Sequence, residues 1–172
     1  GEYPYLPALD RLADVDKYAV VGLGIHEIPL DLIAGTRTQG RQNAFAPNFM
    51  PLLSSTSEFG MKWSRLYDSA IDKGITDPIK VYEYMNRFYV EEGNKRVSVS
   101  LYIGSYSIYA DIYRILPPKS DDPAIQRYYE FIEFNKVTGI FDIIFSHTGD
   151  YRHMAELMEQ NLTDAWPDEV VE

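Results

Sequence analysis

Four consecutive residues, Gly93-Asn94-Lys95-Arg96, have the types and the spacing expected of an anion-binding turn. They follow the apolar segment Arg87–Val90, and the segment from Lys95 to Gly104 is predicted to be a helix. The N–H groups at the start of a helix have no partner within the helix, and the helix dipole makes that end positive. Two cationic side chains beside those N–H groups suit a phosphate or another anion. This turn is the clearest indication of a ligand in the sequence.

The residues of the turn have distinct predicted roles. A guanidinium can hold a phosphate through two parallel hydrogen bonds, so Arg96 is the main candidate anchor and Lys95 a secondary point charge. Gly93 would let the backbone approach the ligand closely. Glu92, directly before the turn, is the candidate catalytic residue, as a general base or beside Mg²⁺. The alternative is a strand-to-helix turn whose charges face solvent, with Glu91 and Glu92 as a capping or solubilising pair.

A second candidate segment is the polar loop from Gly35 to Asn43. If this loop folds against the Gly93 turn, Arg37 and Arg41 would close the far side of a pocket. The hydroxyls of Thr36 and Thr38 would then add donors to a phosphate oxygen. The alternative is an ordinary surface loop.

Other reactive residue types form weaker patterns. The chain has no cysteine, which excludes disulfides, thiolate metal sites and cysteine nucleophiles and is compatible with a reducing cytoplasm. His147 and His153 lie six residues apart with Asp150 between them, a spacing that matches no strong zinc motif, so we predict no metal site. Ser146, His147 and Asp150 are adjacent in sequence, which is not the geometry of a catalytic triad.

Composition limits the function classes. Hydrophobic residues make up 45% and aromatic residues 14% of the 172 residues, which is enough for a packed core. The formal net charge of −10 disfavours nucleic acid as a partner and favours a small anion in a local basic pocket. No apolar run reaches the roughly 18 residues that span a bilayer, so no membrane contact is expected. Among the 14 tyrosines, an exposed aromatic patch for a protein partner is more plausible than base stacking.

Strands and helices alternate along the chain, which indicates a mixed α/β domain. After an N-terminal arm with a short helix, the patterns predict strands at Tyr18–Leu23, Pro78–Tyr84, Arg87–Val90, Ser107–Leu116 and Ile140–Phe145. They predict helices at Asn48–Leu53, Glu58–Lys73, Lys95–Gly104, Asp122–Val137 and Asp150–Gln160.

Read in order, five short motifs resemble the ParB/sulfiredoxin-like family, which includes ParB N-terminal domains and sulfiredoxins. They are Ile28-Pro29-Leu30, Thr38-Gln39-Gly40-Arg41, Gly74-Ile75-Thr76-Asp77-Pro78-Ile79, Gly93-Asn94-Lys95-Arg96 and Ser107-Ile108-Tyr109-Ala110-Asp111-Ile112. The resemblance covers about residues 25–116 and implies the family's mixed sheet with flanking helices. We therefore expect an arm at 1–24, the domain at 25–116, and helical additions at 117–172 packed on it.

The resemblance also implies a nucleotide pocket, with Mg²⁺ if the ligand is a triphosphate. Members of the family use such a pocket for sulfinic-acid repair, CTP hydrolysis or phosphoryl transfer. Two departures narrow these choices: the cysteine of sulfiredoxins is missing, and neither the Glu-Asn-x-x-Arg motif nor the helix-turn-helix of ParB proteins is present. The expected function is binding of a nucleotide or another phosphorylated ligand, with hydrolysis or phosphoryl transfer left open. The alternatives are a non-catalytic regulatory or interaction module of a longer protein and, third, a DNA-binding or nuclease domain.

Overall fold

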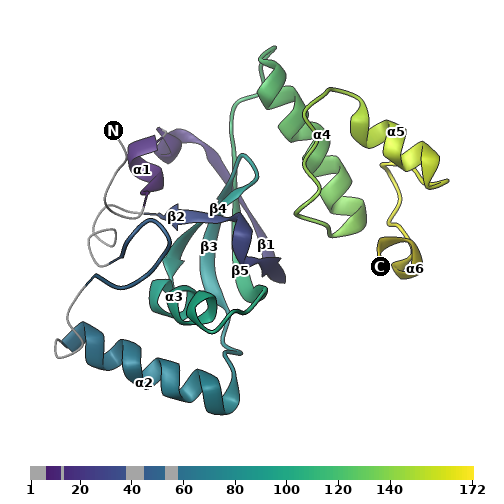
Figure 1. Cartoon of the computed structure of the whole chain (residues 1–172). Coiled ribbons are helices and arrows are strands. Elements are labelled where there is room, and N and C mark those ends of the chain that lie inside the picture. Colours follow the sequence, from purple (N-terminus) through teal and green to yellow (C-terminus); the bar gives the residue numbers. More distant parts are fainter. Residues whose placement is uncertain (1–6, 13, 38–44, 53–57) are drawn as a thin grey trace. The chain divides into compact units, whose positions relative to one another are not determined.

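The structure is a computed structural model that describes residues 7–12, 14–37, 45–52 and 58–172. The chain divides into two compact units, Gly1–Leu116 and Pro117–Glu172. Figure 1 shows their elements, which are coloured along the sequence. No helix within the described ranges combines the length and the apolar character needed to cross a membrane.

The first unit is built around a mixed sheet. In the described part of the chain, five strands lie in the order β1-β5-β3-β4-β2. Their bounds are β1 Ala19–Pro29, β2 Ile33–Thr36, β3 Ile79–Tyr84, β4 Arg87–Glu92 and β5 Ser107–Leu116. The pairs β1–β5 and β3–β4 are antiparallel, whereas β3–β5 and β2–β4 are parallel. The turn between β3 and β4 is tight, because Met85 and Asn86 both adopt positive φ.

Two helices form a layer on one side of this sheet. The helix α3 (Asn94–Tyr102) lies against the strands, and α2 (Glu58–Lys73) lies outside it (Figure 1). The Trp63 indole N–H donates to Ser98 Oγ at 2.9 Å and so ties α2 to α3. The Trp63 and Tyr67 rings stack, and the Tyr102 ring meets each of them edge-on. These aromatic contacts explain why α2 holds its place with only Gly60 and Ala70 fully buried.

The other side of the sheet carries the N-terminal segment. The helix α1 (Leu9–Leu12) and the short 3₁₀ turn η1 (Val15–Lys17) bury Leu9 and Val15 against Tyr89 and Ile115. A second 3₁₀ turn, η2 (Leu30–Leu32), links β1 to β2. The register of β2 shifts between Ile33 and Gly35, so one residue of β2 is extra relative to β4.

A buried ion pair joins the neighbouring strands β3 and β5. Arg114 Nε donates to Glu83 Oε2 at 3.0 Å, and the two side chains are only 2% and 1% exposed. Glu83 Oε1 also accepts the Asn86 backbone N–H at 3.2 Å, so the same carboxylate supports the β3–β4 turn. These partners offset the free-energy cost of burying the Glu83 charge.

The second unit is helical. Its helices are α4 (Pro123–Thr138), α5 (Asp150–Leu157) and α6 (Asp168–Val171). The helix α4 begins as predicted, with Asp122 Oδ1 accepting the Ala124 N–H at 2.9 Å, and it ends at Gly139 in the left-handed conformation. The core of this unit contains a group of aromatic rings in contact, Phe131, Phe134, Tyr151 and Trp166, and the partly buried Phe145 packs on Tyr151. The predicted α/β class, with flanking helices and C-terminal helical additions, is confirmed.

Three predicted elements need correction. Residues 140–145 form no strand, because side chains satisfy their backbone: Asn135 Nδ2 donates to the Ile140 carbonyl at 2.9 Å, and Tyr151 Oη donates to the Ile143 carbonyl at 2.8 Å. The described part of the predicted helix Asn48–Leu53 contains turns and an isolated bridge between Phe45 and Pro51 instead. The short first strand continues to Pro29 through a bulge between Gly22 and Gly24.

Candidate functional site: the amino end of α3

The site is built around Gly93, which separates β4 from α3. Its φ of 113° and ψ of 21° lie in a region that residues with a side chain rarely adopt. A Cβ at this position would lie 2.4 Å from Ile79 Cγ2 and 3.3 Å from Arg96 Nη2. Glycine is therefore required here twice, by its conformation and by the close approach of β3. The amino end of α3 consequently carries no capping side chain.

Arg96 lies directly beside this bare turn. Its Nη1 donates to the carbonyls of Asp77 and Pro78 at 3.0 and 2.9 Å. These bonds tether the guanidinium to the start of β3, and Nη2 lies 3.3 Å from the position that a Cβ on Gly93 would take. A guanidinium held in this way is pre-oriented, and its remaining N–H groups keep their capacity to bind an anion. Sequence reasoning missed the two carbonyl partners, which lie 18 and 19 residues away.

Asn94 and Thr36 form the inner wall of the site. Asn94 Nδ2 donates to Thr36 Oγ1 at 3.3 Å, and Thr36 Oγ1 donates to the Val90 carbonyl at 3.1 Å. Both side chains are buried. Because the Thr36 hydroxyl has used its single hydrogen, Asn94 must present its amide nitrogen to it. Asn94 Oδ1 is then a buried acceptor that finds no hydrogen-bond partner among the described residues.

Lys95 points from the first turn of α3 toward α2. Its Nζ lies 5.1 Å from the centroid of the Phe59 ring. The Lys62 ammonium, which lies 2.9 Å from Glu58 Oε1, holds the pKa of Glu58 below its usual value, and the charge of Lys95 acts in the same direction. Lys95 thus contributes positive charge to the helix start from the α2 side.

Arg37 lies on the opposite face of the sheet from Asn94. Its guanidinium is 5.2 Å from the centroid of the Tyr82 ring, and its Nη2 donates to Asp16 Oδ1 at 3.0 Å. Tyr82 packs against the Leu9 and Val15 cluster. Successive side chains of a strand alternate between faces, so Thr36 faces α3 and the next residue faces the N-terminal segment. The structure brings Thr36, Gly93, Asn94 and Arg96 together and leaves Arg37 apart from them.

Three residues of the predicted site remain, and the structure describes one of them, Glu92. Arg41 and Thr38 lie outside the described residues. Glu92 ends β4, is exposed, and pairs in register with Lys80. Glu92 directly precedes Gly93 and is therefore the carboxylate nearest to the turn in the sequence.

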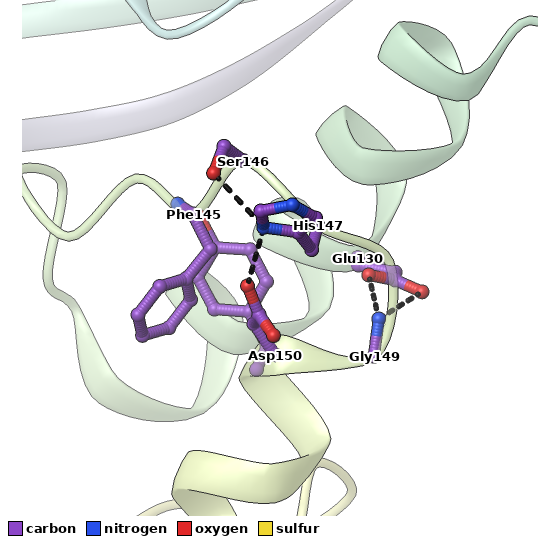
Figure 2. Close-up of polar contacts among 7 residues, drawn as sticks. Glu130, Phe145, Ser146, His147, Gly149 and Asp150 are labelled. Atoms are coloured by element: carbon purple, nitrogen blue, oxygen red, sulfur yellow. Dashed lines mark hydrogen bonds and ion pairs between the residues drawn. The ribbon is translucent and has the colours of Figure 1, made fainter.

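The second unit contains a serine, a histidine and an aspartate in contact, but they do not form a triad. Figure 2 shows that Ser146 Oγ, at 3.1 Å, and Asp150 Oδ2, at 3.8 Å, both approach the same ring nitrogen, His147 Nδ1. A catalytic histidine instead uses its two nitrogens for the two partners. The His147 side chain is also 83% exposed. The described residues contain no group of three His, Asp or Glu side chains that could hold a metal ion.

The amino end of α5 resembles that of α3, but a carboxylate of the protein itself binds there. Gly149, like Gly93, is a left-handed glycine before a helix without a side-chain cap. Here the Glu130 carboxylate accepts the Gly149 N–H at 3.0 and 3.3 Å (Figure 2). An internal anion therefore satisfies this helix start.

The fold and the site together define an α/β domain with a candidate anion site at a strand-to-helix turn. Two solved structures that it resembles are a sulfiredoxin from Arabidopsis thaliana and a Pnob8-like ParB-N domain. The sulfiredoxin is 26% identical, with 51% of this chain and 82% of that chain covered and a TM-score of 0.35. The ParB-N domain is 14% identical, with 69% of this chain and 39% of that chain covered and the same TM-score of 0.35.

One of these structures is a sulfiredoxin and the other a ParB-N domain, the two kinds of protein named in the resemblance of the sequence motifs. No protein-family model matches the chain, and no curated protein matches it. The likenesses say nothing of what this chain binds.

Proposed function

We propose that this chain binds a small phosphorylated ligand, with a nucleotide as the first candidate, at the amino end of α3. The observation that carries the proposal is the tethering of the Arg96 guanidinium by the Asp77 and Pro78 carbonyls beside an uncapped helix start. The first hydrogen bond of α3 runs from Val97 N–H to the Gly93 carbonyl at 2.9 Å, so the amides of residues 94–96 precede the helical ladder.

The other residues of the proposed site supply charge and shape. Lys95 adds a second positive charge, while Thr36 and Asn94 close the inner side. The buried acceptor of Asn94 suits an internal water that bridges to the site. Mg²⁺ would arrive with a triphosphate and keep most of its bonds to phosphate and water. Arg41 and Thr38, which lie outside the described residues, stay in the proposal on the sequence alone, whereas Arg37 does not belong to it.

The proposal concerns binding. Glu92 is the residue to test for a further role in hydrolysis or phosphoryl transfer, because it is the exposed carboxylate next to the turn. Replacing it with glutamine should preserve ligand binding and remove whatever turnover the wild-type chain shows.

Isothermal titration calorimetry with ATP, CTP and ADP, each with Mg²⁺, tests the proposal. We expect Arg96→Ala to weaken binding at least tenfold, which corresponds to about 1.4 kcal/mol. Arg37→Ala is the matched control, because it removes the same charge from the other face of the sheet and should change affinity less than about twofold.

Arg96 also supports the start of β3, so its variant is accompanied by Lys95→Ala, because the Lys95 ammonium lies over the Phe59 ring of α2. Circular dichroism checks that each variant is folded. The absence of binding to all three nucleotides at millimolar concentration, or equal losses in the Arg37 and Arg96 variants, would contradict the proposal.

A further inference from the structure

The second unit carries most of the negative charge of the chain. Residues 117–172 contain twelve Asp and Glu residues and four Lys and Arg residues, so they account for −8 of the formal net charge of −10. Residues 1–116 account for the remaining −2. A field of this sign concentrates cations around the second unit and repels anions. A ligand of this unit is therefore expected to carry positive charge.

A pocket of about 310 Å³ lies within this unit, along one face of α4. The helix lines it with an apolar side chain, an aromatic ring and two carboxylates, which belong to Ile125, Tyr129, Glu130 and Glu133. Residues three or four positions apart on a helix share one face, which explains why these side chains meet there. The segments before α4 and α5 supply the rest of the lining. The volume is at the lower end of the roughly 300–1,000 Å³ of ligand pockets, so a small molecule or a single side chain fits.

The Tyr129 ring gives this pocket a fixed aromatic surface. The Tyr129 hydroxyl donates to the Pro117 carbonyl at 2.6 Å, and the ring packs nearly perpendicular to the Tyr128 ring. Lys119 Nζ lies 5.1 Å from the centroid of the Tyr129 ring, within the range of a cation–π contact. An ammonium group of the chain itself thus already lies over this ring.

The two carboxylates of the pocket differ in their partners. The Glu130 oxygens accept the Gly149 N–H at 3.0 and 3.3 Å, which fixes this carboxylate at the start of α5 (Figure 2). Glu133 is exposed, and none of the described residues forms an ion pair or a hydrogen bond with its carboxylate. A second cation that enters the pocket would therefore find a carboxylate that is not yet paired.

We propose that this pocket binds a primary ammonium group on an aliphatic chain, carried by a free alkylamine or by a lysine side chain of another protein. The ammonium group would replace that of Lys119 over the Tyr129 ring and reach Glu133, while the aliphatic chain would lie on Ile125. Lys119 is exposed and lies outside the helices and strands, so it can leave the ring at little cost. The pocket belongs to the second unit, and the proposal is independent of the anion site at α3.

Amide NMR titration of the full chain, at constant ionic strength, tests the proposal with two probes. Cadaverine is the free amine, and acetyl-Gly-Lys-Gly-amide carries the lysine side chain. We expect saturable shifts of millimolar affinity at the amides of Lys119, Tyr129 and Glu133, and none with the neutral peptide in which the lysine is acetylated. Binding of cadaverine alone would assign the pocket to free amines, and binding of the peptide alone would assign it to lysine side chains.

Variants of the ring separate a built site from general attraction to the negative unit. Tyr129→Leu keeps every charge and should weaken amine binding about threefold, whereas Tyr129→Phe keeps the ring and should bind like wild type. Glu133→Gln should weaken binding about two- to threefold. Glu169→Gln, which removes the same charge from α6, is its control and should have no effect. Circular dichroism checks that each variant is folded.

Removal of a positive charge from the pocket gives the sharpest test. Lys119→Gln vacates the Tyr129 ring, so it should tighten amine binding about two- to fivefold. Arg127→Gln is the matched control, because two positions along a helix turn its side chain away from the face of Tyr129. The absence of saturable shifts with both probes would overturn the proposal. So would equal affinities of the wild type and Tyr129→Leu, or equal effects of the Lys119 and Arg127 variants.

Discussion

Asn94 Nδ2 lies 3.3 Å from Thr36 Oγ1, and this contact joins the first residue of α3 to the last residue of β2 across 58 positions of the chain. The same hydroxyl donates to the Val90 carbonyl on β4. One threonine thus connects two strands and a helix at the point where the proposed ligand would bind.

Replacing Thr36 with valine keeps the shape and removes the hydroxyl. Asn94 Nδ2 would lose its buried partner, while the Val90 carbonyl would keep the Arg37 N–H at 2.8 Å, so we expect the free energy of unfolding to fall by about 1–3 kcal/mol. Urea denaturation measures this loss. Thr148→Val, at an exposed position, is the control and should change stability by less than about 0.5 kcal/mol. A Thr36 variant as stable as the control would show that these bonds are not important for stability.

Glycine is required at position 93 by its backbone conformation and by the nearby Ile79 side chain, and two variants distinguish these causes. Gly93→Ala imposes both an unfavourable φ of 113° and a clash with Ile79. Gly104→Ala imposes only an unfavourable φ of 79°, because nothing lies within 4 Å of its Cβ position. We expect the Gly104 variant to lose about 1 kcal/mol and the Gly93 variant to lose clearly more, in the range of about 2–4 kcal/mol. Equal losses, measured by urea denaturation, would mean that the close approach of Ile79 relaxes without cost.

The buried pair Glu83–Arg114 should be sensitive to the removal of one partner. Arg114→Met leaves the Glu83 carboxylate buried without its guanidinium, and we expect a loss of about 3–5 kcal/mol. Replacing both residues together, as Glu83→Leu with Arg114→Met, removes the stranded charge and should recover much of that stability. Thermal and urea unfolding of the three chains provide the comparison. A double variant less stable than Arg114→Met would contradict this account.

Tyr151 should make the fold sensitive to alkaline pH. Burial raises the pKa of Tyr151, although the hydrogen bond from the Phe145 N–H opposes the shift. The folded state then retains the phenolic proton to higher pH than the unfolded state. The resulting stabilisation is complete below the ordinary tyrosine pKa of about 10 and is lost as pH rises through the raised value.

Tyr151→Phe tests this expectation. At pH 8 the variant should be less stable, because the Ile143 carbonyl and the Phe145 N–H lose their partner. Above about pH 10 its stability should fall less steeply with pH than that of the wild type. Urea denaturation across this range, with the 295 nm absorbance of tyrosinate, follows both effects. Parallel pH profiles of the two chains would rule out the proposed contribution of Tyr151.

Local patterns in the sequence were sufficient to predict several elements. The apolar face of α2, the Asp122 cap and Gly139 stop of α4, and the period-two pattern from Ile108 to Arg114 in β5 each act within a few residues. The structure has these elements with closely similar bounds. The apolar run 140–145 looked like a buried strand, because nothing local reveals that Asn135 and Tyr151 satisfy its carbonyls.

The candidate site was harder to predict, because its members come from distant segments. The charges at Lys95 and Arg96 were visible in the sequence, but the orientation of each side chain depends on α2 and on the start of β3. Thr36 and Arg37 were placed in one pocket on the assumption that they belong to a loop. Thr36 is the end of a strand, and adjacent residues there point to opposite faces, so no single pocket on one face can hold both side chains.

The most direct test of the central claim is an amide NMR titration of the ¹⁵N-labelled chain with Mg²⁺-ATP, Mg²⁺-CTP and inorganic pyrophosphate. The account predicts saturable shifts centred on the amides of Gly93, Asn94, Lys95 and Arg96, with Tyr82 and Arg37 on the other face unaffected. Shifts absent from the amino end of α3, or centred on the N-terminal face around Arg37, would contradict it.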